Sequence, residues 1–203
     1  MTRREFITLF VGAATWSLTA YAQQTDRMRR VGILMPLGEN DPESGRRVVI
    51  FSQMLHQIGW VDGQTIAFEK RFADGDPKRL PTLAAELVHA NCDVIVTQSS
   101  GSIDALRGAT STIPIVMASV GDAVGAGYVA SLSHPGGNIT GLTLVATDQS
   151  AKRLQLIKEL LPGVVRIAVL SNANGAGHRL QLKEMEPAVI KLGLNFSRSQ
   201  SET

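Results

Sequence analysis

The stretch DVIVTQSSGSIDALRGATSTIPIVMA, residues 93–118, contains two short apolar runs, DVIVT and PIVMA, that are rich in valine and isoleucine. Neither run alternates regularly between apolar and polar residues. Continuous apolar runs of this length are typical of strands that helices cover on both faces, as in a parallel sheet. This stretch therefore predicts two buried strands with a helix between them.

Similar runs recur along the chain at intervals of about 20 to 35 residues. We expect strands at residues 31–35, 65–69, 93–97, 114–118, 138–143 and 166–171. Apolar side chains at helical spacing lie between them, as in the sets Val48, Phe51, Leu55 and Ile58, Leu80, Leu83 and Leu87, and Leu154, Ile157 and Leu161. This alternation predicts an α/β fold with a doubly wound parallel sheet, in which ligands bind beyond the carboxyl ends of the strands.

The N-terminal sequence MTRREFITLFVGAATWSLTAYAQQ has the pattern of a signal peptide. Arg3 and Arg4 precede an apolar run over residues 6–18, and a small-x-small cleavage site ends at Ala22. The run is shorter than the about 20 apolar residues that a membrane-spanning helix needs. Paired arginines also occur in the twin-arginine export signal, so both that route and the general secretory route stay open. We predict a signal peptide over residues 1–22 and a periplasmic mature protein.

Composition and motifs exclude several classes of function. Hydrophobic residues make up 44% and charged residues 19% of the chain, with a net charge of +2, which indicates a globular protein without a nucleic-acid partner. Dinucleotide-binding, P-loop and nucleophile-elbow motifs are absent, and the histidines lie far apart. We therefore expect no enzyme, no metal and no cofactor. The single cysteine, Cys92, precedes a predicted strand and is interpreted as a buried apolar residue.

Proline and polar residues predict several boundaries. Asp76 and Pro77 form an N-cap followed by proline at the first helical position. Pro187 lies inside an otherwise helical segment, where it predicts a kink or a break. Residues 195–203 leave the hydrophobic pattern and predict a polar tail. With one strand and one helix after Pro162, we expect these side chains to stay partly exposed: Leu182, Met185, Val189 and Leu192.

The break HPGGN at residues 134–138 allows three hypotheses. It could form a glycine-rich phosphate-binding loop, a glycosylation acceptor at Asn138, or a turn that leads into a strand. Gly136 and Gly137 permit positive φ, and Asn138 can bond its own backbone, as in a turn. A phosphate-binding loop would need a helix that starts just after the glycines, and none is predicted there.

Several segments together carry a family resemblance: RRVGILMPLGENDPE, GWVDGQTIAFEKRFADGDPKRLPTLAAELV, DVIVTQSSGSIDALRGATSTIPIVMASVGDAVGAGYVASL and HPGGNITGL. From about residue 30 to residue 170 the chain resembles the ABC-transporter substrate-binding proteins of the TrpX-like class. The resemblance implies a type I periplasmic-binding fold of two α/β lobes. It also implies that residues 134–138 form a turn between a helix over residues 124–132 and the last strand of the first lobe.

The resemblance implies a first lobe over residues 30–145, a hinge and connecting helix over 146–165, and a fragment of a second lobe over 166–203. Relatives continue further, so we expect a C-terminally truncated chain. The implied function is that of a solute-binding component of an ABC importer, which captures an amino acid or a related small solute. Its partners would be the solute and a membrane permease, and the protein would be a monomer. An inactive fragment and a Rossmann-like hydrolase or transferase are the alternatives.

The resemblance and the rule for carboxyl ends of strands together suggest the ligand-binding residues. Residues 98–102 would hold the α-carboxylate of an amino acid at a helix N-terminus. Asp122 would take the ammonium group, although a helix cap is an equal alternative, and residues 35–37 would line the wall. The predicted ligand-binding residues are Met35, Pro36, Leu37, Gln98, Ser99, Ser100, Gly101, Ser119, Asp122 and Asn172.

The signal-peptide hypothesis predicts that the chain is exported and cleaved after Ala22. N-terminal sequencing of the protein from a periplasmic extract should begin at Gln23. Recovery of the protein from the cytoplasm with an intact Met1 would contradict this prediction.

Overall fold

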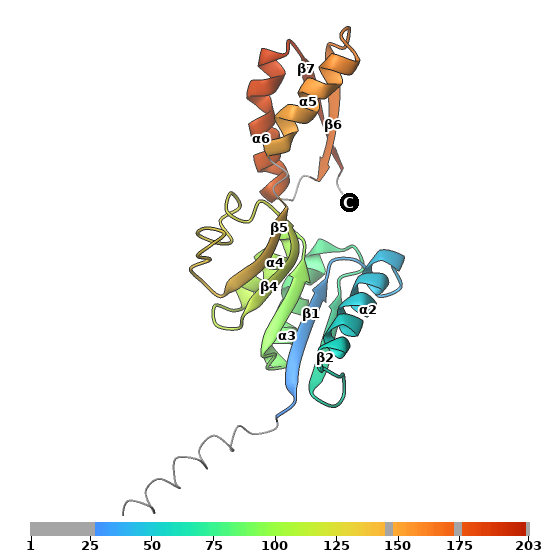
Figure 1. The fold of residues 1–203 in the computed structure, drawn as a ribbon, viewed down its shortest axis with the longest axis vertical. Coiled ribbons are helices and arrows are strands. Elements are labelled where there is room, and N and C mark those ends of the chain that lie inside the picture. Colours follow the sequence, from blue (N-terminus) through green and yellow to red (C-terminus); the bar gives the residue numbers. More distant parts are fainter. Residues whose placement is uncertain (1–26, 145–147, 173–175, 202–203) are drawn as a thin grey trace, which may run out of the picture.

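The structure, a computed structural model, describes residues 27–144, 148–172 and 176–201, which form two separate parallel sheets (Figure 1). The larger sheet has five strands in the order β2-β1-β3-β4-β5, and the smaller pairs β6 with β7. The predicted α/β class with a parallel sheet is confirmed. The predicted signal peptide, residues 1–22, lies outside the described residues.

The elements follow one another as alternating strands and helices. Those of the larger sheet and its helices are β1 (Arg29–Met35), α2 (Pro42–Gln57), β2 (Ile66–Phe72), the 3₁₀-helix η1 (Pro77–Arg79), α3 (Leu80–His89), β3 (Val94–Gln98), α4 (Ser100–Ala109), β4 (Ile115–Gly121) and β5 (Ile139–Leu144). Those of the smaller sheet are α5 (Asp148–Leu160), β6 (Arg166–Asn172), α6 (Ala176–Lys191) and β7 (Asn195–Ser201). Each of the six predicted strands is present, with ends that differ by up to three residues.

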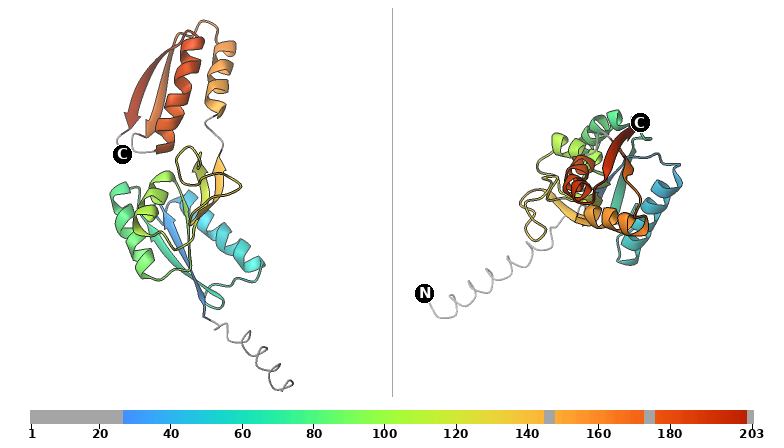
Figure 2. Two further views of the ribbon diagram at one scale, coloured as in Figure 1. Left: turned by 90° about the vertical axis from the view of Figure 1, so that its left-hand side faces the viewer. Right: turned by 90° about the horizontal axis from the view of Figure 1, so that it is seen from above.

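Helices cover the two faces of the larger sheet unequally. Helices α3 and α4 pack on one face and α2 on the other, as Figure 2 shows from the side. Leu34, Ile95 and Ile115, from three neighbouring strands, are fully buried under α3 and α4. Cys92 lies in the same core with its thiol buried, as predicted from the sequence.

The face under α2 is covered only over β1 and β2. Ile33 and Met35 of β1 pack there against Val48 of α2. Beyond them, alternation along β5 places Leu142 and Leu144 on this face, opposite the buried Ile139, and they are 70% and 58% exposed. Among the described residues, no helix packs over this part of the face (Figure 1).

Strand β4 contains a bulge where it passes between its two neighbours. In the pairing with β3, Thr97 lies opposite Met117 but Gln98 lies opposite Ser119, so Ala118 is an extra residue. The register with β5 shifts over the same part of β4, between Met117 and Val120. A bulge changes which side chains of a strand point to each face.

Gly141 of β5 makes this arrangement possible. Its φ is +134°, and a Cβ atom at this position would lie 2.2 Å from the Met117 carbonyl oxygen. Only glycine leaves room for two backbones that approach so closely. The glycine therefore determines how β5 pairs with the bulged strand.

The segment after β4 is not the helix that was predicted over residues 124–132. One turn starts at Asp122 and ends at once, because Tyr128 donates its backbone N–H to Ala123 O and Gly127 donates to Val124 O. This pair of bonds, with Gly127 at φ +70°, is the Schellman motif that ends helices. The helix that the resemblance implied was wrong, because Gly127 ends the helix after a single turn.

The break at residues 134–138 is a turn, as one of the three hypotheses held. Gly136 has φ +78°, whereas Gly137 does not use positive φ, and β5 starts directly after Asn138. The Asn138 side chain does not bond its own backbone. Its Nδ2 atom donates to the Ile113 carbonyl at 2.9 Å and so ties the turn to the start of β4.

The smaller sheet has its own apolar core, formed by Leu154 of α5, Met185 and Val189 of α6, and Leu194. Met185 and Val189 are buried, so the expectation that they stay partly exposed was wrong, whereas Leu182 and Leu192 are half-buried, as expected. The expectation failed because α5 packs beside α6, where Leu154 of α5 covers the apolar side chains of α6. The lobe boundaries stay a prediction.

The expected polar tail and the expected break at Pro187 were both wrong, whereas a kink at Pro187 stays a prediction. The predicted polar tail forms β7, which pairs with β6 over its whole length. Backbone groups make this pairing, so β7 needs no apolar pattern. Helix α6 continues through Pro187. Pro187 has no N–H to donate to the carbonyl of Lys183, one turn earlier. Both residues are exposed, so water can solvate that carbonyl.

The close approach of Gly141 to Met117 predicts a strong effect of a single methyl group. Gly141→Ala should lower the free energy of unfolding by more than about 2 kcal/mol, because the backbone of β4 or β5 must move. Gly137→Ala is the matched control, since a Cβ atom there meets nothing within 4 Å, and its effect should stay within about 0.5 kcal/mol. Urea denaturation measures both, and equal midpoints for the two variants would contradict the prediction.

Candidate functional site

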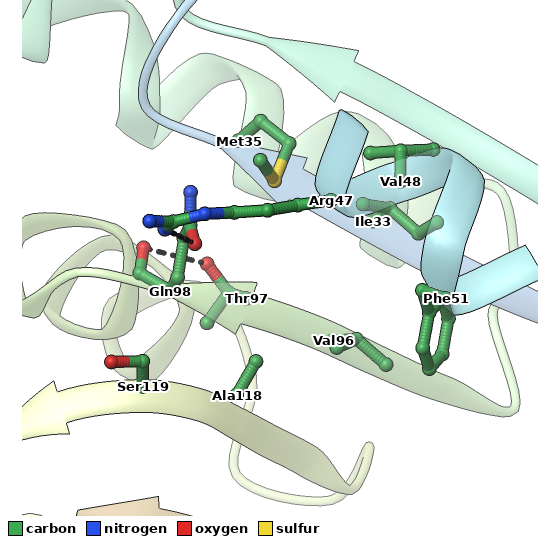
Figure 3. Close-up of a pocket in the computed structure, with 10 residues that line it drawn as sticks. All are labelled: Ile33, Met35, Arg47, Val48, Phe51, Val96, Thr97, Gln98, Ala118 and Ser119. Carbon is green, nitrogen blue, oxygen red and sulfur yellow. Dashed lines mark hydrogen bonds between the residues drawn. The ribbon is translucent and has the colours of Figure 1, made fainter. Parts of the chain in front are cut away.

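A cavity with a volume of about 320 Å³ lies between α2 and the larger sheet (Figure 3). It spans β1 and β3, where the strand order reverses, because the chain moves from β1 to β2 on one side and then to β3 on the other. Ligands of open α/β sheets bind at this kind of position. The lining residues are Ile33, Met35, Arg47, Val48, Phe51, Val96, Thr97, Gln98, Ala118 and Ser119.

The floor of the cavity is apolar. Ile33, Met35 and Val48 are buried in the small core between β1 and α2. The Phe51 ring lies at one end of the floor and packs at a tilt on Phe68, with 6.2 Å between ring centroids. These side chains can contact the hydrocarbon part of a ligand.

The rim of the cavity carries the polar groups. Arg47 extends from α2 toward β3, where its Nη1 atom donates to the Gln98 side-chain oxygen (Figure 3). Its Nε atom donates to Glu43 Oε1 at 2.8 Å. Thr97 is also at the cavity, but its hydroxyl is buried and donates to the Leu34 carbonyl at 2.8 Å. Arg47, Gln98 and Ser119 are therefore the side chains that can bind a polar ligand group.

Arg47 is oriented by the first turns of α2. The helix starts with Asp41 as its N-cap, whose carboxylate accepts from the Ser44 backbone N–H at 2.8 Å, and with Pro42 in its first turn. Glu43, one turn before Arg47, accepts hydrogen bonds from the guanidinium groups of both Arg46 and Arg47. The hydrogen bond from Arg47, together with the charge of Arg46, lowers the pKa of Glu43.

The bulge in β4 brings Ser119 to this site. Regular alternation would place Ser119 on the same face as the buried Met117, under α4. Because the bulge adds a residue, Ala118 and Ser119 both line the cavity and Val120 returns to the core. One irregular position thus exchanges a valine for a serine at the cavity.

The structure brings together Met35, Gln98 and Ser119 of the predicted ligand-binding residues. The other predicted residues of the larger sheet do not line this cavity: Pro36, Leu37, Ser99, Ser100, Gly101 and Asp122. Asn172 is the last residue of β6, and its side chain lies outside the described part of the structure. The prediction missed Arg47 and Phe51, which α2 contributes. Arg47 directly precedes Val48, which lies on the predicted apolar face of this helix. That position could have indicated that the Arg47 side chain lies at the edge of the helix–sheet contact.

The polar groups of the predicted anion-binding loop after β3 form hydrogen bonds within the protein. Ser99, at φ +85°, caps α4 and accepts from the Ser102 N–H at 3.3 Å, and the two hydroxyls lie 3.0 Å apart. The hydroxyl of Tyr128, whose pKa burial raises, donates to the Ser100 carbonyl at 3.3 Å. These bonds hold the loop in place beside the cavity.

Asp122 acts as a cap in this structure. Its Oδ1 atom accepts from the Gly125 N–H at 2.8 Å, and its carbonyl accepts from the Ala126 N–H at 3.0 Å. The residue has φ +32°, a value that aspartate and asparagine tolerate better than most residues. Of the two roles predicted for Asp122, the cap is the one that its hydrogen bonds show.

The described residues form neither a metal site nor a membrane span. In the described part of the chain, no group of three or more histidine, cysteine, aspartate or glutamate residues could hold a metal ion. No helix in that part is long and apolar enough to cross a membrane. Burial raises the pKa of the Cys92 thiol, which makes it a poor nucleophile.

Residues 42–200 match the family described as ABC transporter substrate binding protein. The chain belongs to this family. A tyrosine-binding protein from Clostridioides difficile is 33% identical over 136 residues, which cover 66% of this chain and 39% of that protein. The family consists of solute-binding proteins, not enzymes, as the missing catalytic motifs indicated.

Solved structures agree with this assignment. A conserved domain protein from Vibrio cholerae is 28% identical, with a TM-score of 0.74, and an ABC domain in complex with L-Trp from Streptococcus pneumoniae is 25% identical, with a TM-score of 0.72. Each match covers 86% of this chain and 58% of the other chain. The fold is that of the type I periplasmic-binding proteins. This chain thus spans less than two thirds of the length of these relatives.

The cap role of Asp122 predicts a difference between two substitutions. Asp122→Ala should lower the free energy of unfolding by about 1 kcal/mol, because the Gly125 N–H loses its acceptor. Asp122→Asn should change it much less, since asparagine caps almost equally well. Thermal unfolding of the two variants measures this difference, and equal losses of stability would contradict the cap role.

Proposed function

We propose that this chain is the solute-binding component of an ABC importer and that it binds an amino acid or a related small solute. The cavity between α2 and the larger sheet carries the proposal. It combines an apolar floor with a charged and polar rim at the position where α/β sheets bind ligands. The family assignment supplies the class of function.

The chemistry of the cavity suits a solute with an apolar side chain and a polar backbone. Met35 and Phe51 would contact the side chain, while Arg47, Gln98 and Ser119 would bind the polar groups. A volume of about 320 Å³ is at the lower end of the usual range for ligand pockets, which fits a single amino acid. The relatives described as tyrosine-binding and as complexed with L-Trp support an amino acid.

The remaining predicted residues are proposed to complete the site from its edges. Pro36 and Leu37 follow β1, and residues 99–101 follow β3, at the same carboxyl edge of the larger sheet. The smaller sheet lies beyond this edge, and β6 runs with its carboxyl end, at Asn172, toward it (Figure 1). Closure of the two sheets around the solute, as in hinged binding proteins, would bring Asn172 to the solute.

The proposed location and partners follow from the same function. The protein would be exported to the periplasm by the signal over residues 1–22, bind solute as a monomer, and deliver it to a membrane permease. Asp122 is proposed as a second solute contact, through the carboxylate oxygen that does not cap the turn. Asp122→Asn tests that contact, because it removes the charge and keeps the cap.

A titration followed by NMR tests the proposed function, because it detects weak binding by a chain that spans part of its relatives. Addition of L-tryptophan, L-tyrosine or L-leucine to the ¹⁵N-labelled protein should shift the backbone amide signals of Met35, Gln98 and Ser119. Ala118→Trp, which fills the cavity, should abolish these shifts, whereas Ser133→Trp on an exposed loop should keep them. Unshifted signals with all three amino acids would contradict the proposed function.

A further inference from the structure

Arg47 is the only charged residue among those described as lining the cavity, and no acidic residue lines it. The other lining side chains are apolar or neutral. A cation at the rim of an apolar cavity favours a ligand that brings its own negative charge. The charge of the lining therefore favours an anionic group over an ammonium group at this position.

The local charge balance leaves Arg47 incompletely neutralised. Glu43 is its acidic partner, with the Arg47 Nη2 atom 2.8 Å from Oε1. The other oxygen of Glu43 pairs with Arg46 at 3.0 Å. One carboxylate thus serves two guanidinium groups, and the group of Arg46, Arg47 and Glu43 keeps one positive charge beside the cavity.

Gln98 accepts a hydrogen bond from Arg47 that a ligand could accept in its place. Its side-chain oxygen faces Arg47 Nη1 inside the cavity (Figure 3). An amide oxygen is a neutral acceptor, and a carboxylate forms a stronger, charge-assisted bond with a guanidinium group. A carboxylate that enters the cavity can therefore replace the Gln98 oxygen with a net gain.

On the basis of the proposed function, we propose that Arg47 is the anchor for the carboxylate of the bound solute. The solute displaces the Gln98 oxygen from Nη1, while Glu43 keeps hold of Nε and orients the guanidinium group. The apolar part of the solute then extends over Met35 and Phe51. This assigns the carboxylate to Arg47 and not to the N-terminus of α4, where Ser99 already caps the helix.

The test compares L-tryptophan with L-tryptophanamide, in which a neutral carboxamide replaces the carboxylate and the rest of the molecule is kept. Their dissociation constants are measured by NMR titration of the full chain. The wild-type protein should prefer L-tryptophan by about tenfold or more, as expected for a charge-assisted bond. Using a ratio of two ligands removes the effect of any change in the folded fraction.

Three variants complete the design. Arg47→Ala should lose the preference for L-tryptophan. Arg46→Ala is the comparison variant, because Arg46 shares Glu43 but does not line the cavity. It removes the excess charge but leaves the Arg47 donors in place, so the preference should fall much less than in Arg47→Ala. Gln98→Glu should lose it too, because a tethered carboxylate then occupies Arg47, and its thermal stability should not fall.

The outcomes separate the inference from the proposed function. If the wild-type chain binds neither compound nor any other amino acid, the proposed function fails. If it binds both equally well, or if Arg47→Ala keeps the preference, solute binding stands and Arg47 is not the anchor. Loss of the preference in Arg47→Ala and Gln98→Glu but not in Arg46→Ala supports the anchor.

Discussion

The contact of Gly141 with the backbone of Met117 is the constraint on which the site depends. It allows β5 to pair closely with β4 on both sides of the bulge, although β4 has one extra residue there. The bulge turns Ser119 toward the cavity and returns Val120 to the core. Without it, a regular strand would present valine to the cavity and bury serine under α4 at a cost in stability. A close backbone approach at the sheet edge thus affects the polarity of a site that spans β1, β3 and β4.

Helix α2 shows the same link between packing and the site. At helical spacing from Arg47, the helix carries the exposed Ile50 and Met54, and the exposed Ile58 follows it as the C-cap. Among the described residues, no helix covers the sheet face beyond Arg47. Parallel sheets are usually buried on both faces. Because α2 covers only β1 and β2, solvent can reach the cavity. The same incomplete cover leaves apolar side chains exposed beside it.

The strands of the larger sheet could be predicted because short runs rich in valine and isoleucine are typical of parallel strands, as in VIV of β3. Strand β7 could not, because its polar residues pair with β6 through the backbone alone. The helix expected over residues 124–132 failed at Gly127, a single position that outweighs the apolar pattern around it. In the site, Met35, Gln98 and Ser119 could be predicted from the ends of strands. Arg47 could not, because its approach to Gln98 depends on how α2 lies across the sheet.

The polar residues at the ends of the strands divide into two groups for a physical reason. Short side chains that follow a strand directly, such as Ser99 and Asp122, bond to the backbone N–H groups of the next turn. Those N–H groups need acceptors whether or not a ligand is present, so the short side chains are used in the fold. Gln98 has a longer side chain and is still part of its strand, and Ser119 lies on a bulge, so neither caps a turn. Residues of this second group remain available for a ligand, which explains why they and not the caps line the cavity.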